Sequence, residues 1–317
     1  MRKILINAVL LIVVLLLFPL NSASANMGAP FGFGSSSANL IVDPKNVLSV
    51  KEEYLRFEVS HGDVYANITY KIVNSGEDGT FTFVFPALNV YHAGEEFDFK
   101  VKVFDKEIKY EVKTEEELRN LLKDNSESIE KLLSFKDEIF FDPLTGKEYT
   151  PQIGTHREGE KVFFIFSIFL KKDTLTEVNV SFKSFAGFDA RRYQINILHY
   201  YYILDVKDFY KTFENVKIEI VYPKTYPLKS NFEGTVSRVG DKNILTIELN
   251  NNFKNLSFSY MEKRLSKIQV LTYRAFPFLF GESFFFFLIL LVLPLTVASI
   301  FVAIVVKWSN KHFGRRN

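Results

Sequence analysis

The stretch that decides the fold is VYANITYKIV, residues 64–73, in which apolar and polar side chains alternate. One face would carry Val64, Ala66, Ile68, Tyr70 and Ile72, and the other would carry Tyr65, Asn67, Thr69 and Lys71. Successive side chains of a β-strand point to opposite faces, so this alternation is typical of a strand with one buried face. The stretch therefore predicts a half-buried strand.

The same pattern continues on the C-terminal side of this stretch. Residues 74–79, NSGEDG, supply turn residues, and residues 80–86, TFTFVFP, alternate again, which predicts a hairpin with a longer loop. FDFKVKVF at 97–104 and IKYEV at 108–112 predict a second hairpin, joined by the tight connection Asp105-Lys106-Glu107.

Further strands are predicted in the second half of the chain. The run that begins at Val162 is apolar on both faces and predicts a central strand, whereas the run around Val178 alternates and predicts a partly exposed one. Three more alternating segments follow, VKIEIVYP at 216–223, ILTIEL at 244–249 and LSFSY at 256–260. Short strands without regular alternation of strands and helices are typical of antiparallel β-sandwiches.

The predicted organisation is therefore mainly β. We expect a flexible Gly/Ser-rich leader at 26–38, a β-sandwich domain at 39–187 and a second β-sandwich domain at 188–262. One continuous larger sandwich is the alternative.

A helical insertion, residues 114–134, interrupts the β pattern. Thr114 is followed three residues later by Glu117, which is the spacing of a capping box. The leucines after it are spaced as one helical face, which predicts an amphipathic helix or a helical hairpin broken near Asn125. Such an insertion would pack on the sandwich edge or, alternatively, bind a partner.

The N-terminus has the three parts of a secretory signal peptide. Arg2 and Lys3 precede an apolar run at 4–20, and Ala23-Ser24-Ala25 follows it. We expect a signal peptide over 1–25, cleaved after Ala25, with an uncleaved signal anchor as the alternative.

The C-terminal segment 284–306 contains no charged residue. Its 23 residues would span about 34 Å as a helix, enough to cross a hydrocarbon core of about 30 Å. The tail at 307–317 carries Lys307, Lys311, Arg315 and Arg316 but no acid, which is typical of a cytoplasmic flank. We therefore expect a single-pass membrane protein with its large domain outside the cytoplasm. A buried C-terminal helix is the alternative.

The juxtamembrane segment, residues 263–283, mixes apolar and basic residues. It carries Leu265, Ile268, Val270 and Leu271 among Arg264, Lys267 and Arg274. It is expected either to lie along the outer leaflet or to form the last strand with a short basic linker.

Composition excludes several classes of function. The chain has no cysteine, which excludes disulfides and thiolate chemistry, and an exported domain of this kind suits a prokaryotic envelope. The formal charge of +2 provides no overall field that would recruit nucleic acid.

Candidate catalytic groups are few. His61, His92, His156, His199 and His312 are scattered without the spacing of a metal site, and the sequence has no GxSxG elbow, no HExxH and no Walker-type phosphate loop. Two groups of carboxylates lie beside aromatic residues and could contact a sugar: Asp137, Glu138 and Asp142 around 139–141, and Asp205 and Asp208 after 200–202. Core packing of the aromatic residues is the simpler explanation, so we expect no catalytic residue, cofactor or metal.

Two stretches carry a resemblance. VLSVKEEYLRFEV followed by YKIVNSGEDGTFTFVFPA, and later HYYYILDVKDFYKTFENVKIEIVYP, resemble uncharacterised families of membrane-anchored bacterial envelope ectodomains. The first half is also similar, more faintly, to the VIT-type β-sandwich domain. The resemblance implies a β-sandwich ectodomain and brings no catalytic residues.

The sequence thus predicts a non-enzymatic binding or structural module, held by the lipid bilayer and facing an envelope partner. Two alternatives stay open: a glycan-binding protein or glycan hydrolase, and an accessory subunit of a membrane complex that associates through 284–306.

Overall fold

The computed structural model describes residues 31–32, 36–38, 41–42, 47–90, 98–121, 139–150, 160–189, 193, 195–206, 209–250, 254–275, 299 and 302–305. The predicted signal peptide and basic tail lie outside these residues. So do the part of the helical insertion after residue 121 and nearly all of the predicted membrane segment.

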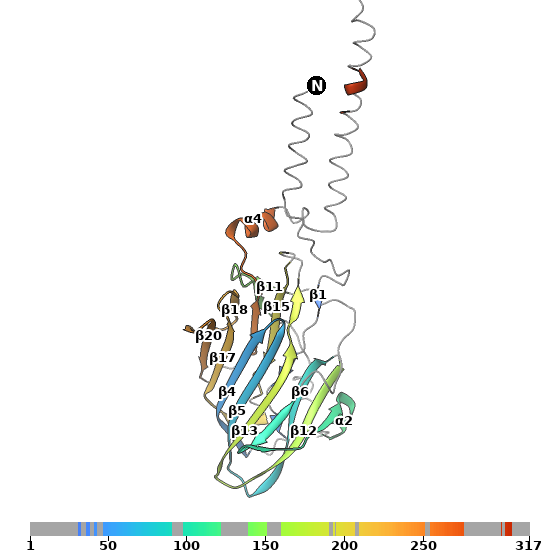
Figure 1. Ribbon diagram of the computed structural model, residues 1–317. Helices are drawn as coiled ribbons and strands as arrows, with labels where there is room; N and C mark the ends of the chain where they lie inside the picture. The colour runs from blue at the N-terminus through green and yellow to red at the C-terminus, as the bar shows by residue number, and fades with distance from the viewer. Residues whose placement is uncertain are drawn as a thin grey trace, which may run out of the picture. The chain divides into compact units, whose positions relative to one another are not determined.

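Most of the described residues belong to two large sheets (Figure 1). The ten-stranded sheet contains β1 (Phe31–Gly32), β2 (Ser36–Ala38), β3 (Ile41–Val42), β6 (Gly79–Val90), β9 (Glu111–Thr114), β12 (Glu160–Leu170), β14 (Gly187–Asp189), β15 (Ile197–Ile203), β18 (Leu228–Ser230) and β21 (Leu256–Tyr260). The nine-stranded sheet contains β4 (Leu48–Ser60), β5 (Asp63–Asn74), β7 (Lys100–Val103), β8 (Lys106–Glu107), β13 (Leu175–Phe185), β16 (Thr212–Phe213), β17 (Val216–Pro223), β19 (Thr235–Val239) and β20 (Lys242–Leu249).

Three smaller elements are also present: a two-stranded sheet of β10 (Phe140–Phe141) and β11 (Glu148–Tyr149), and the helices α2 (Glu115–Leu121) and α4 (Lys267–Ala275). The mainly β prediction is confirmed.

Aromatic side chains hold the two large sheets together. Phe57 of β4 meets Tyr200 and Tyr202 of β15, with ring centroids 5.7 and 5.4 Å apart. Phe85 of β6 meets Phe182 of β13 at 5.0 Å. Because these pairs join strands of opposite sheets, the sheets pack face to face over one aromatic core.

The alternation at 64–73 is confirmed. The apolar side chains on one face of β5 are at most 1% exposed, whereas Tyr65, Asn67, Thr69 and Lys71 lie on the outer face. β5 is paired antiparallel on both sides, with β4 and with β13. The run from Val162 to Phe166 in β12 is also buried on both faces, as predicted.

The first predicted hairpin is wrong. β5 and β6 belong to different sheets, so residues 75–78 carry the chain from one layer to the other. The actual hairpin joins β4 to β5 through His61 and Gly62, whose φ angles of 48° and 82° suit a tight turn. Alternation shows only that a strand buries one face. A strand can do so in either sheet of a sandwich, so alternation does not show which strands pair.

The second predicted hairpin is confirmed in part. β7 pairs with β8, but the turn lies at Phe104 and Asp105, one residue earlier than predicted. Residues 111–114 then leave this sheet and pair with β12 in the other one.

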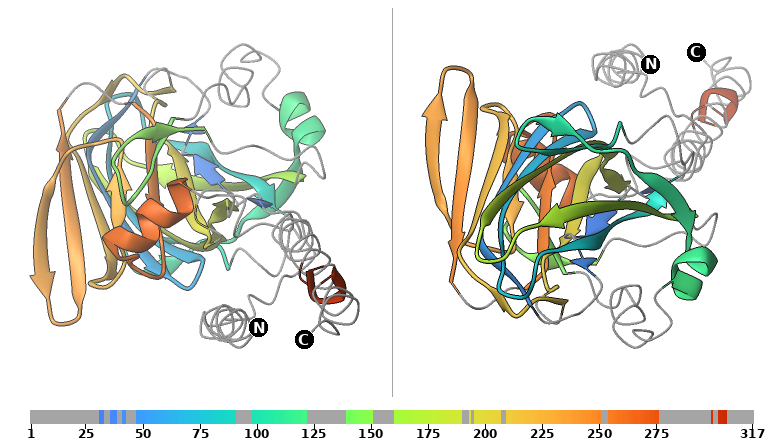
Figure 2. Two further views of the ribbon diagram at one scale, coloured as in Figure 1. Left: turned by 90° about the horizontal axis from the view of Figure 1, so that it is seen from above. Right: turned by 90° about the horizontal axis from the view of Figure 1, so that it is seen from below.

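The predicted domain boundary near residue 187 is not found among the described strands. β17 pairs in parallel with β4, and β15 pairs in parallel with β2, so strands from both sides of residue 187 share both sheets. Figure 2 shows the later strands continuing the same two layers. The described strands form one continuous sandwich, which is the alternative considered above.

The capping box at the start of the insertion is confirmed. The Thr114 N–H donates to Glu117 Oε2 over 2.8 Å, and the Glu117 N–H donates to Thr114 Oγ1 over 3.4 Å. Leu118 of α2 is fully buried against the sandwich core, so this first part packs on the sheet as predicted. Within the described part of the chain, no helix combines the length and the apolar character needed to cross a membrane.

Candidate functional site

A β-bulge in β4 creates the most distinctive polar feature of the structure. Leu48 and Val50 face the core before the bulge, and Leu55 and Phe57 face it afterwards, so the apolar positions shift by one residue. The register with β5 shifts between Val50 and Glu52. An extra residue at this point lets both apolar runs face inward.

The bulge turns one carboxylate into the sandwich. Glu53 takes an inward position and is 1% exposed, whereas Glu52 next to it is exposed. The Glu53 N–H donates to the Asn215 carbonyl over 3.1 Å, and Asn215 Nδ2 donates to the Lys51 carbonyl over 3.1 Å. Asn215 has a φ of 47°, a conformation that asparagine tolerates well. The start of β17 is therefore fastened to the bulge.

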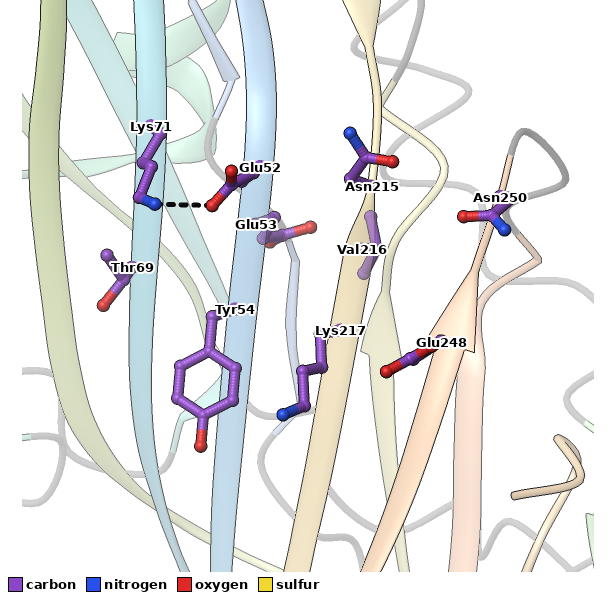
Figure 3. Close-up of a pocket in the computed structure, with 10 residues that line it drawn as sticks. All are labelled: Glu52, Glu53, Tyr54, Thr69, Lys71, Asn215, Val216, Lys217, Glu248 and Asn250. Atoms are coloured by element: carbon purple, nitrogen blue, oxygen red, sulfur yellow. Dashed lines mark hydrogen bonds and ion pairs between the residues drawn. The ribbon is translucent and has the colours of Figure 1, made fainter. Parts of the chain in front are cut away.

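Beside the bulge, a hollow of about 400 Å³ opens on the outer face of the nine-stranded sheet (Figure 3). It is called the sheet hollow below. Its lining residues come from β4, β5, β17 and β20 and from the segments that adjoin them: Glu52, Glu53, Tyr54, Thr69, Lys71, Asn215, Val216, Lys217, Glu248 and Asn250. Strand register places four of them in one row across the sheet, in the order Thr69, Tyr54, Lys217 and Glu248.

Charges of both signs line the sheet hollow and pair with one another. Lys71 Nζ lies 2.6 Å from Glu52 Oε2, and this hydrogen bond raises the pKa of Lys71. Lys71 is therefore charged at neutral pH. Exposed pairs of this kind add little to stability, typically below about 1 kcal/mol, so their main consequence is the pattern of charge they present.

A second network lies beside the hollow, around Glu219. Tyr54 donates to Glu219 Oε2 over 2.5 Å, and Arg56 Nη1 donates to the same oxygen over 2.8 Å. Burial raises the pKa of Glu219, but the hydrogen bond from Tyr54 and the nearby Lys217 and Arg56 together hold it below its usual value. Burial and the same hydrogen bond raise the pKa of Tyr54. At neutral pH this network therefore presents a carboxylate, two cations and a neutral phenol.

The sheet hollow can bind a polar ligand through carboxylates, amides, hydroxyls and lysines on one rigid sheet. Across the described ranges, no group of three or more histidine or acidic side chains is placed to hold a metal ion. The chemistry of the lining is that of recognition through hydrogen bonds and charge.

The carboxylates proposed for sugar contact lie elsewhere. Asp142 is fully buried, and its Oδ2 accepts a hydrogen bond from the Tyr193 hydroxyl over 2.5 Å. Its Oδ1 accepts from the N–H groups of Leu144 and Thr145 over 2.9 and 3.2 Å, so it closes the turn between β10 and β11. It is therefore enclosed and not exposed to a ligand.

Only one other carboxylate of that prediction is described. Asp205 is half-buried just after β15. Tyr200 and Tyr202 point into the aromatic core rather than outward. Asp137, Glu138 and Asp208 lie outside the described residues.

Two of the five histidines are described. His61 is exposed in the β4–β5 turn, with Nδ1 3.9 Å from Glu262 Oε1. His199 of β15 packs edge-on against Phe140, and burial lowers its pKa to about 4 despite the opposing effect of Asp189. Its Nδ1 is buried and has no hydrogen-bond partner among the described residues. His92, His156 and His312 lie outside them.

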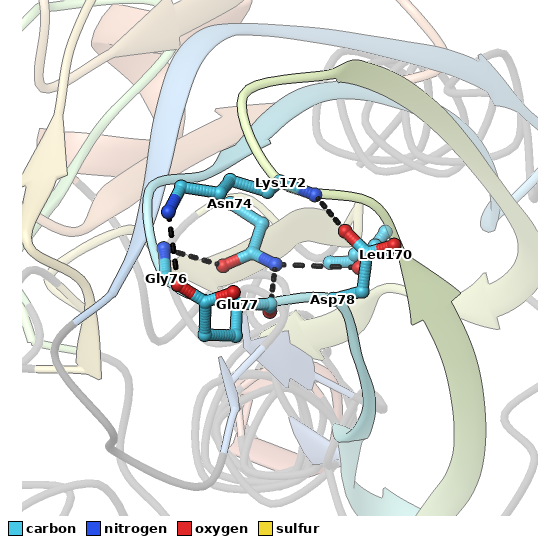
Figure 4. A network of polar contacts seen from close by, with 6 residues as sticks. All are labelled: Asn74, Gly76, Glu77, Asp78, Leu170 and Lys172. Atoms are coloured by element: carbon cyan, nitrogen blue, oxygen red, sulfur yellow. Dashed lines mark hydrogen bonds and ion pairs between the residues drawn. The ribbon is translucent and has the colours of Figure 1, made fainter.

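Asn74 occupies the corner where the chain crosses between the sheets (Figure 4). Its Nδ2 donates to the carbonyls of Glu77 and Leu170 over 2.8 and 3.3 Å, and its Oδ1 accepts from the Gly76 N–H over 2.9 Å. The Lys172 N–H donates to Asp78 Oδ1 over 2.7 Å in the same corner. These bonds join the β5–β6 and β12–β13 connections and explain Asn74 as a structural residue.

Sequence reasoning missed the sheet hollow. The signal that could have found it is the shift of apolar positions within LSVKEEYLRFEV, residues 48–59, which indicates a bulge and an inward acidic residue. The participation of β17 and β20 could not be read in this way, because it depends on a parallel pairing between distant segments.

Comparisons with known proteins bear on the fold. No family model matches the chain, and no curated protein matches its sequence. A solved structure from Legionella pneumophila, whose proposed role is nutrient binding, is similar with a TM-score of 0.53 and 12% identity over 80% of this chain and 78% of that one. At this identity the similarity shows the fold alone.

Two other solved structures match more weakly. An M1 zinc metallopeptidase from Deinococcus radiodurans has a TM-score of 0.34 and 7% identity over 69% of this chain and 43% of that one. Yeast LTA4 hydrolase has a TM-score of 0.34 and 8% identity over 70% of this chain and 30% of that one. These similarities are too low to support an argument about activity.

Proposed function

We propose that this chain is a single-pass membrane protein whose β-sandwich stands outside the cytoplasm and binds an envelope partner without catalysing a reaction. The observation that carries the proposal is the sheet hollow, whose lining residues from four strands of one sheet are mostly polar or charged. The membrane anchor and the export signal rest on residues 284–306 and 1–25 of the sequence.

The arrangement of charges favours recognition. The carboxylates of Glu52 and Glu219 already accept hydrogen bonds from cationic or hydroxyl groups of the protein. Side chains held in this way present a fixed pattern of donors and acceptors, which gives specificity for a complementary polar surface. Their strands are each paired on both sides, so the pattern is rigid.

A protein partner is favoured over a glycan by the surroundings of the outward tyrosines. Lys217 Nζ lies 5.6 Å from the centre of the Tyr54 ring, and Lys183 Nζ lies 5.6 Å from that of Tyr65. A sugar ring binds best to an open aromatic face, and a lysine already covers one face of each of these rings. The nutrient role proposed for the Legionella protein makes a small polar ligand a second outcome to test.

The test is photocrosslinking in intact cells from two outer faces of the same sandwich. A photoreactive residue replaces Glu248, which lines the sheet hollow, or Ser167, which is exposed on the other sheet. We expect one protein to be captured from position 248 and not from position 167. Equal capture from both positions, or no capture from 248, would contradict the proposal, and capture of glycan alone would replace the protein partner with a carbohydrate.

A charge reversal sharpens this test. Lys71→Glu together with Lys217→Glu should abolish capture from position 248, because it reverses both cations of the hollow. The matched control is Lys171→Glu, an exposed lysine in the β12–β13 connection that should leave capture unchanged.

A further inference from the structure

The helix α4 forms part of the predicted juxtamembrane segment and begins with a capping box of its own. The Ser266 N–H donates to Gln269 Oε1 over 2.9 Å, and the Gln269 N–H donates to Ser266 Oγ over 3.2 Å. These reciprocal bonds satisfy donors that the first turn of a helix leaves open. Residues 267–275 are therefore helical, and the alternative of a last strand with a linker is wrong for this part of the segment.

One side of α4 is fixed to the sandwich. Leu265, just before the helix, is 6% exposed, and Val270 packs against the same small apolar cluster. That cluster contains Phe140, Tyr149, Tyr193, Ile197 and Met261. The orientation of the helix is therefore set by the folded domain.

The opposite side of α4 presents apolar side chains to the surface. Ile268 is 77% exposed and Leu271 is 68% exposed. Residues three apart lie on the same face of a helix, so these two side chains form one apolar patch. Exposed apolar pairs on a fixed helix are typical of surfaces that contact a protein or a membrane.

Exposed basic residues directly precede this patch in the sequence. Lys263, Arg264 and Lys267 are all exposed, and the nearest acid in the sequence is Glu262. Cations beside an amphipathic helix are attracted to anionic lipid headgroups, whereas a second copy of this helix would bring like charges together. The charge pattern therefore favours a lipid surface as the occupant.

Chain length limits how far α4 can lie from the predicted membrane segment. Residues 276–283 separate the end of α4 at Ala275 from residue 284, and this stretch of eight contains one charged residue, Glu282. Eight residues reach at most about 28 Å when fully extended. If 284–306 crosses the bilayer, α4 must therefore lie within about that distance of the lipid headgroups.

We propose that α4 lies on the outer leaflet, with Ile268 and Leu271 in the interfacial region and the neighbouring cations against anionic headgroups. This inference rests on the proposed membrane anchoring and adds a second, surface contact to it. Such a contact orients the sandwich relative to the bilayer, which a single transmembrane helix leaves undetermined.

The chain contains no cysteine, so a single introduced cysteine can carry a fluorescent probe without a background signal. The full chain with Ile268→Cys or Leu271→Cys is labelled and reconstituted in vesicles of phosphatidylcholine and phosphatidylglycerol that contain lipids with a quenching group in the upper acyl chain. Val236→Cys is the matched control, since Val236 is 59% exposed on β19 in the sandwich. We expect quenching of about twofold or more at positions 268 and 271 and little at 236.

Vesicle flotation separates this inference from the one it rests on. If the labelled chain does not float with the vesicles, the membrane anchor itself is refuted. If the chain floats and the probes at 268 and 271 are quenched no more than the probe at 236, the docking of α4 is refuted while the anchor stands. Unchanged quenching after phosphatidylglycerol is replaced by phosphatidylcholine would refute the part assigned to the cations.

Discussion

Polar side chains occupy two contrasting environments in this sandwich. In the first environment the side chain is enclosed and contacts other groups of the protein, as for Asn74, Asp142 and His199. Arg56 and Glu219 lie on the outer face of the nine-stranded sheet and pair across strands. When an enclosed polar group is removed, its hydrogen-bond partners stay buried and unsatisfied. When an outer group is removed, water can take its place as the hydrogen-bond partner. The enclosed set should therefore determine stability, and the outer set should determine binding.

The largest effect is expected from acidification around His199. Its folded pKa is about 4, below the ordinary value of about 6.5, because burial disfavours the charged ring. The unfolded chain therefore binds the proton first, and stability falls as the pH drops through the window from about 6.5 to about 4. A shift of this size corresponds to a loss of about 3 kcal/mol in the free energy of unfolding.

Urea unfolding at several pH values, followed by circular dichroism of the full chain in detergent, measures this effect. His199→Phe keeps an aromatic ring beside Phe140 but removes the titrating group, so its stability should depend less on pH in this window. Equal pH dependence of the two proteins would show that His199 is not the group responsible.

Asn74→Ala should cost about 2 to 3 kcal/mol, since it removes three hydrogen bonds at this corner, one of which joins the two chain crossings. The matched control is Lys172→Ala in the same corner, which removes the exposed ion pair with Glu77 and should cost less than about 1 kcal/mol. Urea unfolding compares the two variants. If the two variants lose the same free energy of unfolding, the stability of this corner does not depend on the Asn74 side chain.

Tyr193→Phe should lower the free energy of unfolding by about 1.5 kcal/mol. The variant keeps the ring but removes the hydroxyl that donates to the buried Asp142, which retains its two backbone donors. The midpoint of thermal unfolding would report the loss. No change would mean that the carboxylate is satisfied without Tyr193.

Arg56→Ala should have the smallest effect on stability, below about 1 kcal/mol. Glu219 keeps the hydrogen bond from Tyr54 and the ion pair with Lys217, 3.2 Å away. Capture of the partner from position 248 should nevertheless fall, because the charge pattern beside the sheet hollow changes. A large loss of stability without loss of capture would reverse the roles assigned to the outer and the enclosed residues.

Much of the fold can be predicted from local pattern, and little of the candidate site. The inward and outward faces of β5 and the capping box at Thr114 follow from residue spacing and are present in the structure. The hairpin predicted between 64–73 and 80–86 and the boundary predicted near residue 187 were wrong, because both depend on which strands become neighbours. Asp142 was predicted to contact a sugar but is enclosed, because it accepts a hydrogen bond from Tyr193, 51 residues away.

The sequence by itself determined which segments form strands, through the alternation of apolar and polar residues. It also determined where the helix after Thr114 begins and that the chain carries apolar segments at both ends. These properties depend on side chains a few residues apart. The tertiary structure alone decided that β17 lies parallel to β4 and that strands from both parts of the chain line one hollow beside the bulge. They could not be read from spacing, since each requires contacts between segments more than 150 residues apart, such as Arg56 with Glu219.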